Sequence, residues 1–244
     1  MTELQIENQD AVRILCMNRP DKHNALNTAL TQALLDALRA ADRDSTVRAV
    51  VLAGNGRSFC AGADTREFAG LTAQHADAVS RRAELTTELH QVFSLMGKPV
   101  VSAVHGNALG GGAGLALACD MTVAADDMRF GYPELRHGIV AAVVMANLVR
   151  QVGRKQAFEL VALAEPIDGA RALALGLANR VVPAGQVRDT ALELARRMAA
   201  WDPAAMKLTK RSFHRAADLG LAEALAVGRD ANTIMRSFGG GGGQ

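Results

Sequence analysis

The chain has 244 residues, a size that suits one α/β domain with a small appendage. Apolar residues make up 49% and charged residues 21%, the balance of a globular protein with a buried core rather than of a disordered chain. With 27 Lys and Arg against 25 Asp and Glu the formal charge is +2, and no basic run is present, so we expect no nucleic-acid partner.

The N-terminal half of the chain alternates predicted strands and helices. In chain order they are a hairpin over 4–17, a helix over 30–41, a strand at 49–53, a helix over 85–96, a strand at 100–104, a helix near 113–119 and a strand at 121–125. The strand at 49–53 is a continuous apolar run, which is typical of a strand buried on both faces, and we expect the strands at 100–104 and 121–125 to be buried as well. Strands that alternate with helices in this way predict a mostly parallel sheet.

From Ile139 onward the sequence predicts mainly helices. They are expected at 140–152, 154–163, 168–175, 186–199, 203–217 and 221–236, with a short strand at 180–182. Asp168 is a plausible N-cap for the third of them. We therefore divide the chain into a core over 1–185, a C-terminal helical region over 186–238 and a glycine-rich tail over 239–244, which we expect to be disordered.

Cysteine usage and the N-terminal composition indicate a reducing compartment. The chain has three widely separated cysteines, Cys16, Cys60 and Cys119. An odd number without a Cys-x-x-Cys pair argues against a disulfide framework. Residues 1–5 lack the basic start and apolar run of a secretory signal, so we expect a cytoplasmic protein. The uncharged stretch 99–119 is interrupted by a histidine, an asparagine and five glycines, so we expect no membrane span.

Several common catalytic patterns are absent from the sequence. Gly110 and Gly112 begin a dinucleotide-binding pattern, but Leu115 stands where its third glycine would be needed. No phosphate-binding loop of the Gly-x-x-x-x-Gly-Lys type and no Gly-x-Ser-x-Gly nucleophile turn occurs. The six histidines show no metal-ligand spacing, so we expect no metal.

Two glycine-containing loops remain as candidates for chemistry. Residues 57–64 follow the strand at 49–53, and Gly110-Gly111-Gly112 follows the strand at 100–104. Both offer backbone N–H groups beyond strand ends, where α/β folds build their sites. Two converging N–H groups stabilise an oxyanion. The alternative interpretation is that the glycines only permit tight packing, and composition alone favours it.

Five stretches of sequence resemble, in the same order, the signatures of the crotonase superfamily, also called the enoyl-CoA hydratase/isomerase family. They are Asn18-Arg19-Pro20 with Asn24-Ala25-Leu26-Asn27; Leu52-Ala53-Gly54 through Phe59-Cys60-Ala61-Gly62-Ala63-Asp64; Lys98-Pro99-Val100 through Gly106-Asn107-Ala108-Leu109-Gly110-Gly111-Gly112 and Ala118-Cys119-Asp120; Phe130-Gly131-Tyr132-Pro133-Glu134 with Gly138; and Ala174-Leu175-Gly176-Leu177-Ala178. The resemblance extends over roughly residues 1–215.

This resemblance implies an α/β fold built as a spiral of ββα units, with a helical C-terminal region that serves trimer assembly, either as a homotrimer or as a dimer of trimers. It implies an acyl-CoA thioester as substrate, with no cofactor besides the coenzyme A that the substrate carries. The N–H groups of Ala63 and Gly111 match the family's oxyanion hole. The resemblance therefore favours an oxyanion hole, rather than tight packing alone, as the role of the two glycine-containing loops.

Glu134 matches the family's catalytic carboxylate and is the candidate acid/base. Typical hydratases carry a second glutamate where this chain has Gly114. One carboxylate suits the transfer of a proton from one carbon to another, so the pattern resembles the Δ3,Δ2-enoyl-CoA isomerases most closely. A hydratase or hydratase-lyase acting on a specialised acyl-CoA is the first alternative, and a non-catalytic acyl-CoA-binding scaffold is the second.

The remaining candidates for the site surround these three positions. By resemblance, substrate or CoA contacts are expected from Asn24, Ala25, Leu26, Ala61, Asp64, Arg66, Gly110 and Tyr132, with Lys207, Lys210 and Arg211 as weaker candidates. His137 is a possible accessory acid/base three residues after Glu134, although a solvated loop histidine is the simpler interpretation.

Overall fold

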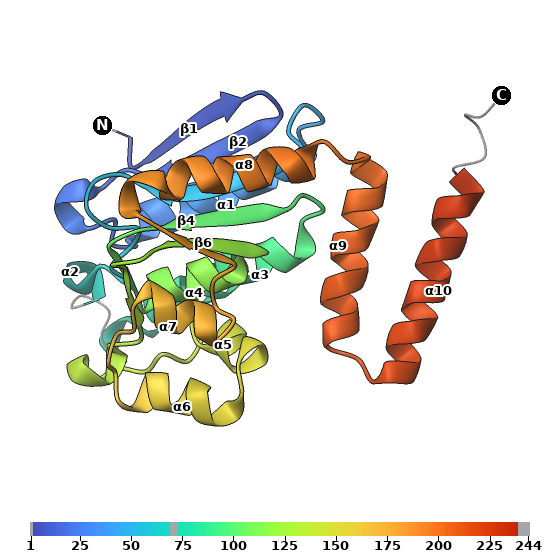
Figure 1. The fold of residues 1–244 in the computed structure, drawn as a ribbon. Helices are drawn as coiled ribbons and strands as arrows, with labels where there is room; N and C mark the ends of the chain where they lie inside the picture. Colours follow the sequence, from blue (N-terminus) through green and yellow to red (C-terminus); the bar gives the residue numbers. More distant parts are fainter. Residues whose placement is uncertain (1, 69–72, 239–244) are drawn as a thin grey trace.

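A six-stranded sheet forms the centre of the molecule, which is described by a computed structural model for residues 2–68 and 73–238. β1 (Leu4–Gln9) and β2 (Val12–Met17) form the predicted antiparallel hairpin. β3 (Ala49–Gly54), β4 (Val100–Val104), β6 (Met121–Ala125) and β8 (Arg180–Val182) continue from β2 in parallel, in the order β1-β2-β3-β4-β6-β8 (Figure 1). The predicted strands and their mostly parallel arrangement are confirmed.

Helices cover both faces of this sheet, as its buried and mostly apolar central strands require. α1 (Thr28–Arg43), α3 (Ala76–Leu95) and α4 (Gly111–Ala118) pack on one face, and α8 (Val187–Ala199) crosses the other face (Figure 1). The Asn27 side chain accepts a hydrogen bond from the Leu30 N–H and caps α1, which buries its apolar face against the strands. α4 is buried along its whole length, so its N-terminus is fixed by packing from every side.

A second, two-stranded sheet was not predicted from the sequence. β5 (Asn107–Leu109) and β7 (Arg129–Gly131) pair in parallel, and an isolated bridge joins Cys60 to Ala108. Each strand has only three residues, too few for an alternating pattern to become visible. This small sheet joins the two glycine-containing loops to the segment that carries Glu134.

Most of the C-terminal helices agree with the prediction. They are α6 (Arg154–Ala162), α7 (Gly169–Ala174), α8, α9 (Pro203–Ala217) and α10 (Leu221–Phe238). The short α2 (Thr65–Phe68), earlier in the chain, has no predicted counterpart. The Asp168 side chain caps α7 through the Arg171 N–H, as expected. The helix predicted over 140–152 is wrong in its first half, because α5 spans only Ala146–Gln151. Turns precede it, after Gly138 with its φ of +67°.

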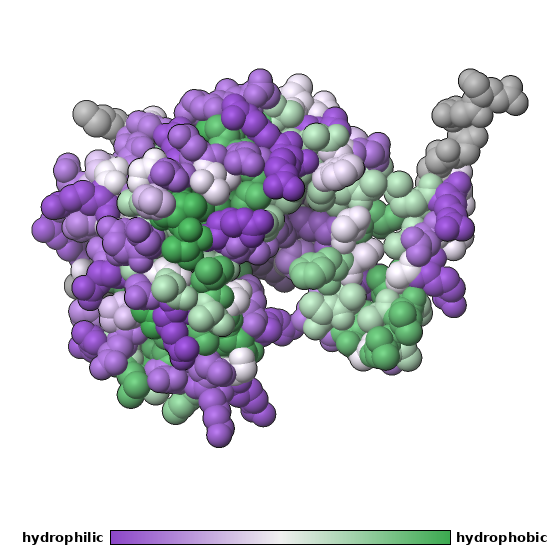
Figure 2. Space-filling view, in the orientation of Figure 1, coloured by the Kyte–Doolittle hydropathy of each residue, from purple (hydrophilic) through white to green (hydrophobic). Residues whose placement is uncertain are grey.

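The C-terminal helical region predicted over 186–238 does not form a single packing unit in the structure. α8 packs on the sheet, whereas α9 and α10 pack against each other as a hairpin that extends from the body (Figure 1). A hollow lies between the body and α9 (Figure 2). The proposed boundary at 185/186 therefore stays a division of the sequence, and the tail 239–244 lies outside the described residues. None of the described helices has the length and apolar character needed to cross a membrane.

Candidate active site

The carboxyl group of Glu134 lies against the N-terminus of α4. Glu134 begins a short 3-10 turn, Glu134–His137, just after β7. A Cβ built on Gly110 would lie 2.5 Å from its Oε1, so only a glycine leaves room for the carboxyl group. Gly110 also has a φ of +52°, which favours glycine for a second reason. Oε2 is buried and has no hydrogen-bond partner among the described residues.

Burial changes the acidity of Glu134. It raises the pKa of the carboxyl group above its usual 4.5, although a hydrogen bond from its own backbone and the nearby His137 act in the opposite direction. A carboxyl group with a raised pKa holds its proton closer to neutral pH and is suited to exchange it with a substrate. The free Oε2 is the atom available for that exchange.

Two backbone N–H groups stand close together beside this carboxyl group. Gly111 is the first residue of α4, and a Cβ built on it would lie 3.9 Å from the Ala63 nitrogen. In the described part of the chain, neither the Ala63 N–H nor the Gly111 N–H donates a hydrogen bond. Two adjacent free donors at the start of a helix form a preorganised site for an oxyanion.

Hydrogen bonds between distant segments hold these donors in place. The Leu26 N–H donates to the Gly62 carbonyl at 2.7 Å, and the Asp64 N–H donates to the Leu26 carbonyl at 3.1 Å. Cys60 and Leu109 are joined by a 3.0 Å backbone bond. Arg19 forms an ion pair with Asp64 at 2.8 Å. The first, second and third sequence signatures thus meet in one network around Ala63 and Gly111.

The structure brings Leu26, Ala61, Asp64 and Gly110 to this site, but it gives the other predicted contact residues different surroundings. Asn24 is fully buried, and its amide donates to the carbonyls of Asn55 and Ser58, so its side chain is held by protein partners. Ala25 is half-buried in the same turn, and Arg66 is exposed. The proposed CoA contacts of these residues stay predictions.

Tyr132 lies under the Glu134 turn rather than on the surface. Its ring is buried edge-on against Phe130, with centroids 5.9 Å apart. Its hydroxyl group has no hydrogen-bond partner among the described residues. Burial and the neighbouring Glu134 charge raise the pKa of the phenol, so Tyr132 stays neutral. Its expected contact with the substrate remains untested.

His137, the predicted accessory residue, has an exposed side chain.

At the position of Gly114, the structure shows a residue that the sequence analysis missed. A Cβ built on Gly114 would lie 2.7 Å from Nε2 of His90, which is on α3. His90 stands in a predicted helix with no motif around it, so no sequence signal marked it.

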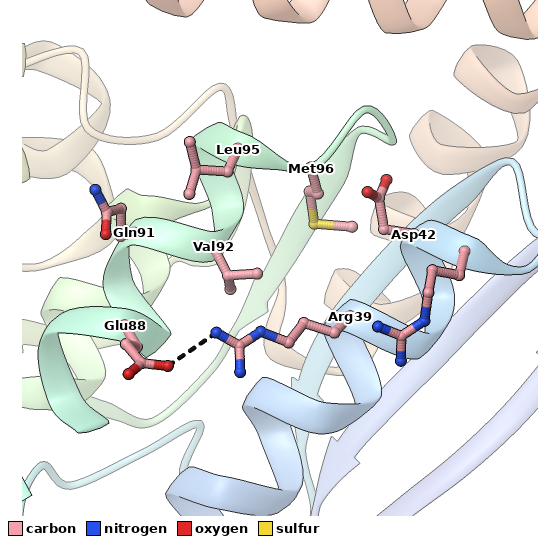
Figure 3. A pocket seen from close by; sticks show the side chains of 8 residues that line it. Arg39, Asp42, Glu88, Gln91, Val92, Leu95 and Met96 are labelled. Carbon is pink, nitrogen blue, oxygen red and sulfur yellow. Dashed lines mark hydrogen bonds and ion pairs between the residues drawn. The ribbon is translucent and has the colours of Figure 1, made fainter. Parts of the chain in front are cut away.

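Two other features lie outside this site. Lys210 is buried, and its ammonium group donates to Asp120 at 2.7 Å and to the Lys98 carbonyl at 2.8 Å. The ion pair fastens α9 to the segments that precede β4 and β6, and the suggested contact of Lys210 with the nucleotide stays a prediction. The hollow in Figure 3, between α1 and α3, holds the Arg39–Glu88 ion pair and none of the predicted site residues.

Among residues 2–68 and 73–238, no three His, Cys, Asp or Glu side chains gather in a possible metal site.

Replacement of Glu134 by glutamine should stabilise the fold at neutral pH. The folded state raises the pKa above 4.5, so it binds this proton more tightly than the unfolded chain does, and stability falls as the pH rises through the folded pKa. Glutamine avoids the buried charge. Melting temperatures should be higher for Glu134→Gln than for the wild type at neutral pH, and the difference should shrink below about pH 4.5. Glu165→Gln, at an exposed position, is the matched control.

The sequence and the fold of this chain are similar to those of known proteins. The family model described as enoyl-CoA hydratase/isomerase matches residues 7–236. A putative enoyl-CoA hydratase of Thermus thermophilus is 38% identical, over 93% of this chain and 90% of the relative. The 2,3-dehydroadipyl-CoA hydratase of Escherichia coli is 36% identical, over 96% of this chain and 91% of the relative.

A solved structure named as an enoyl-CoA hydratase of Mycobacterium smegmatis superposes with a TM-score of 0.91 at 31% identity. The match covers 95% of this chain and 90% of that one. The fold predicted from the five signatures is confirmed.

Proposed function

This chain belongs to the enoyl-CoA hydratase/isomerase family, and from that membership we propose that it adds water to a 2-enoyl-CoA thioester, with Glu134 delivering the proton to the α-carbon. The observation that carries the proposal is the Glu134 carboxyl group at Gly110, next to the free N–H groups of Ala63 and Gly111. Coenzyme A enters as part of the substrate, and we propose no separate cofactor.

The geometry provides what the chemistry at a thioester needs. Addition at the β-carbon moves an electron pair toward the thioester oxygen, which becomes an oxyanion. The Ala63 and Gly111 N–H groups bind that oxygen, and each such donor contributes about 2.7–4 kcal/mol where single donors have been removed in other enzymes. Glu134 then transfers its proton to the α-carbon as the enolate collapses.

Isomerisation of a 3-enoyl-CoA to the 2-enoyl isomer, the reaction favoured by the sequence analysis, is the second candidate. It needs only one acid/base, and Glu134 is the one carboxylate that the described residues place at Gly110. Hydration comes first because the relatives named above are called hydratases. A hydratase-lyase shares the hydration step. A binding scaffold has no use for a buried carboxyl group with a raised pKa.

A mass-resolved assay separates these candidates. The purified chain is incubated with 2-enoyl-CoA and, separately, with 3-enoyl-CoA thioesters of short, medium and long acyl chain. We expect the 2-enoyl substrate to gain the mass of one water. Conversion of the 3-enoyl substrate at unchanged mass, without hydration, would establish the isomerase instead. Binding without turnover at any chain length would contradict both enzymes and support the scaffold.

The C-terminal helices support a proposal about assembly. α9 and α10 expose large apolar side chains, among them Phe213, Leu221 and Leu225, and green apolar patches lie on the visible face of their hairpin beside a purple edge along α10 (Figure 2). Exposed apolar surface of this extent is typical of a protein–protein interface. A homotrimer, or a dimer of trimers, would cover it.

A further inference from the structure

The imidazole of His90 is an unused proton acceptor inside the molecule. Its Nδ1 lies 2.8 Å from the Thr86 carbonyl oxygen. A carbonyl oxygen only accepts, so Nδ1 carries the proton and Nε2 of the neutral ring is left with a free lone pair. Nε2 is buried, and within the described part of the chain it has no hydrogen-bond partner. A buried acceptor without a partner is costly unless a small molecule supplies a donor.

Nε2 faces the same helix that carries the oxyanion donor. It lies where a side chain on Gly114 would begin, and Val144 fills the rest of that space, with its carbonyl oxygen 2.9 Å from a Cβ built on Gly114. The Gly114 N–H donates to the Gly110 carbonyl at 2.9 Å, so the two glycines stand one helical turn apart on one face. Glu134 borders the first glycine, and His90 borders the second.

This spacing suits a two-group reaction. Four residues of an α-helix rise about 6 Å along the axis, so the two glycines that Glu134 and His90 border are about that far apart. The charge states also fit: burial and the nearby Arg82 lower the pKa of the His90 imidazole, which keeps it neutral, whereas burial raises that of Glu134. A neutral imidazole can accept a proton, and a carboxyl group with a raised pKa is a better proton donor at neutral pH than an exposed one.

We propose that His90 is the second acid/base of this site and activates the water that adds to the β-carbon of a 2-enoyl-CoA. This inference rests on the hydration proposed above. Nε2 takes a proton from water, and the water oxygen bonds to the β-carbon. The π electron pair moves to the thioester oxygen held by Ala63 and Gly111, and Glu134 gives its proton to the α-carbon. The imidazolium proton then returns through solvent to the Glu134 carboxylate.

The test compares hydration with a partial reaction that needs no activated water. Hydration is measured with but-2-enoyl-CoA, and enolate formation is measured as α-proton exchange of butanoyl-CoA in deuterated water. We expect His90→Gln to lose about 100-fold or more in hydration while keeping its α-proton exchange. The control is Gln91→Ala, the next residue on α3, whose side chain lines the separate hollow of Figure 3; it should keep both activities.

Chemical rescue distinguishes a catalytic role from a structural one. In His90→Ala, added imidazole should restore hydration, whereas pyrrole, a ring of the same size without a basic nitrogen, should not. Hydration at the wild-type rate by His90→Gln would overturn this inference and leave the proposed function standing. Loss of both activities without rescue by imidazole would also overturn it. A wild type that exchanges the α-proton but does not hydrate would overturn the proposed function and this inference together.

Discussion

Glu134→Gln is expected to lower turnover of the enoyl-CoA substrate by a factor of about 10² to 10⁴ and to leave acyl-CoA binding nearly unchanged. Glutamine has the same size and shape as glutamic acid, so it fits against Gly110 as the carboxyl group does. It cannot release and recover a proton. Because only the transition state needs that proton, kcat should fall while the dissociation constant for a saturated acyl-CoA stays the same.

The measurement pairs steady-state kinetics with calorimetric titration of the saturated acyl-CoA. Glu165→Gln, at an exposed position, serves as the control for a charge change elsewhere on the surface. A Glu134→Gln variant that keeps the kcat of the wild type would remove this residue from the mechanism. Loss of binding together with turnover would instead assign the carboxyl group to substrate binding.

Gly112→Ala is expected to disable the oxyanion hole without touching Glu134. A Cβ on Gly112 would overlap the Cys60 carbonyl group, with only 2.8 Å to its carbonyl carbon. This neighbour is backbone, so the loop over 60–64 has to move as a unit, and Ala63 moves away from Gly111. Loss of one donor lowers kcat by about 10² to 10³. Overpacking should also destabilise the fold by about 1–3 kcal/mol.

Gly228→Ala is the matched control for this substitution. Gly228 lies in α10, and apart from the backbone of its own helix no atom of the described residues stands within 4 Å of a Cβ built there. Alanine should be neutral or stabilise the helix by up to about 1 kcal/mol, with unchanged kcat. Turnover is measured well below both melting temperatures, so that unfolding does not contribute. A folded Gly112→Ala variant with wild-type kcat would show that the two N–H groups do not act as a pair.

The sequence by itself determined the elements that depend on near neighbours. The apolar run at 49–53 and the largely apolar stretches at 100–104 and 121–125 predicted three strands of the sheet, because burial on both faces shows within one short stretch of sequence. Asp168 marked the start of α7, since a capping side chain and the N–H group that donates to it are three residues apart. The signatures identified Glu134, Ala63 and Gly111 as one set, and the structure places them together.

Only the tertiary structure decided the features that depend on distant segments. The two strands of three residues, β5 and β7, form because each finds the other as a partner across the chain. Asn24 is occupied by the backbone of a loop thirty residues on, and Lys210 by Asp120. His90 reaches Gly114 because α3 packs on α4, and neither sequence segment predicts that contact. The sequence pattern within one segment determines its backbone conformation and which of its side chains are buried. Which residues then surround a buried side chain depends on how distant segments pack together.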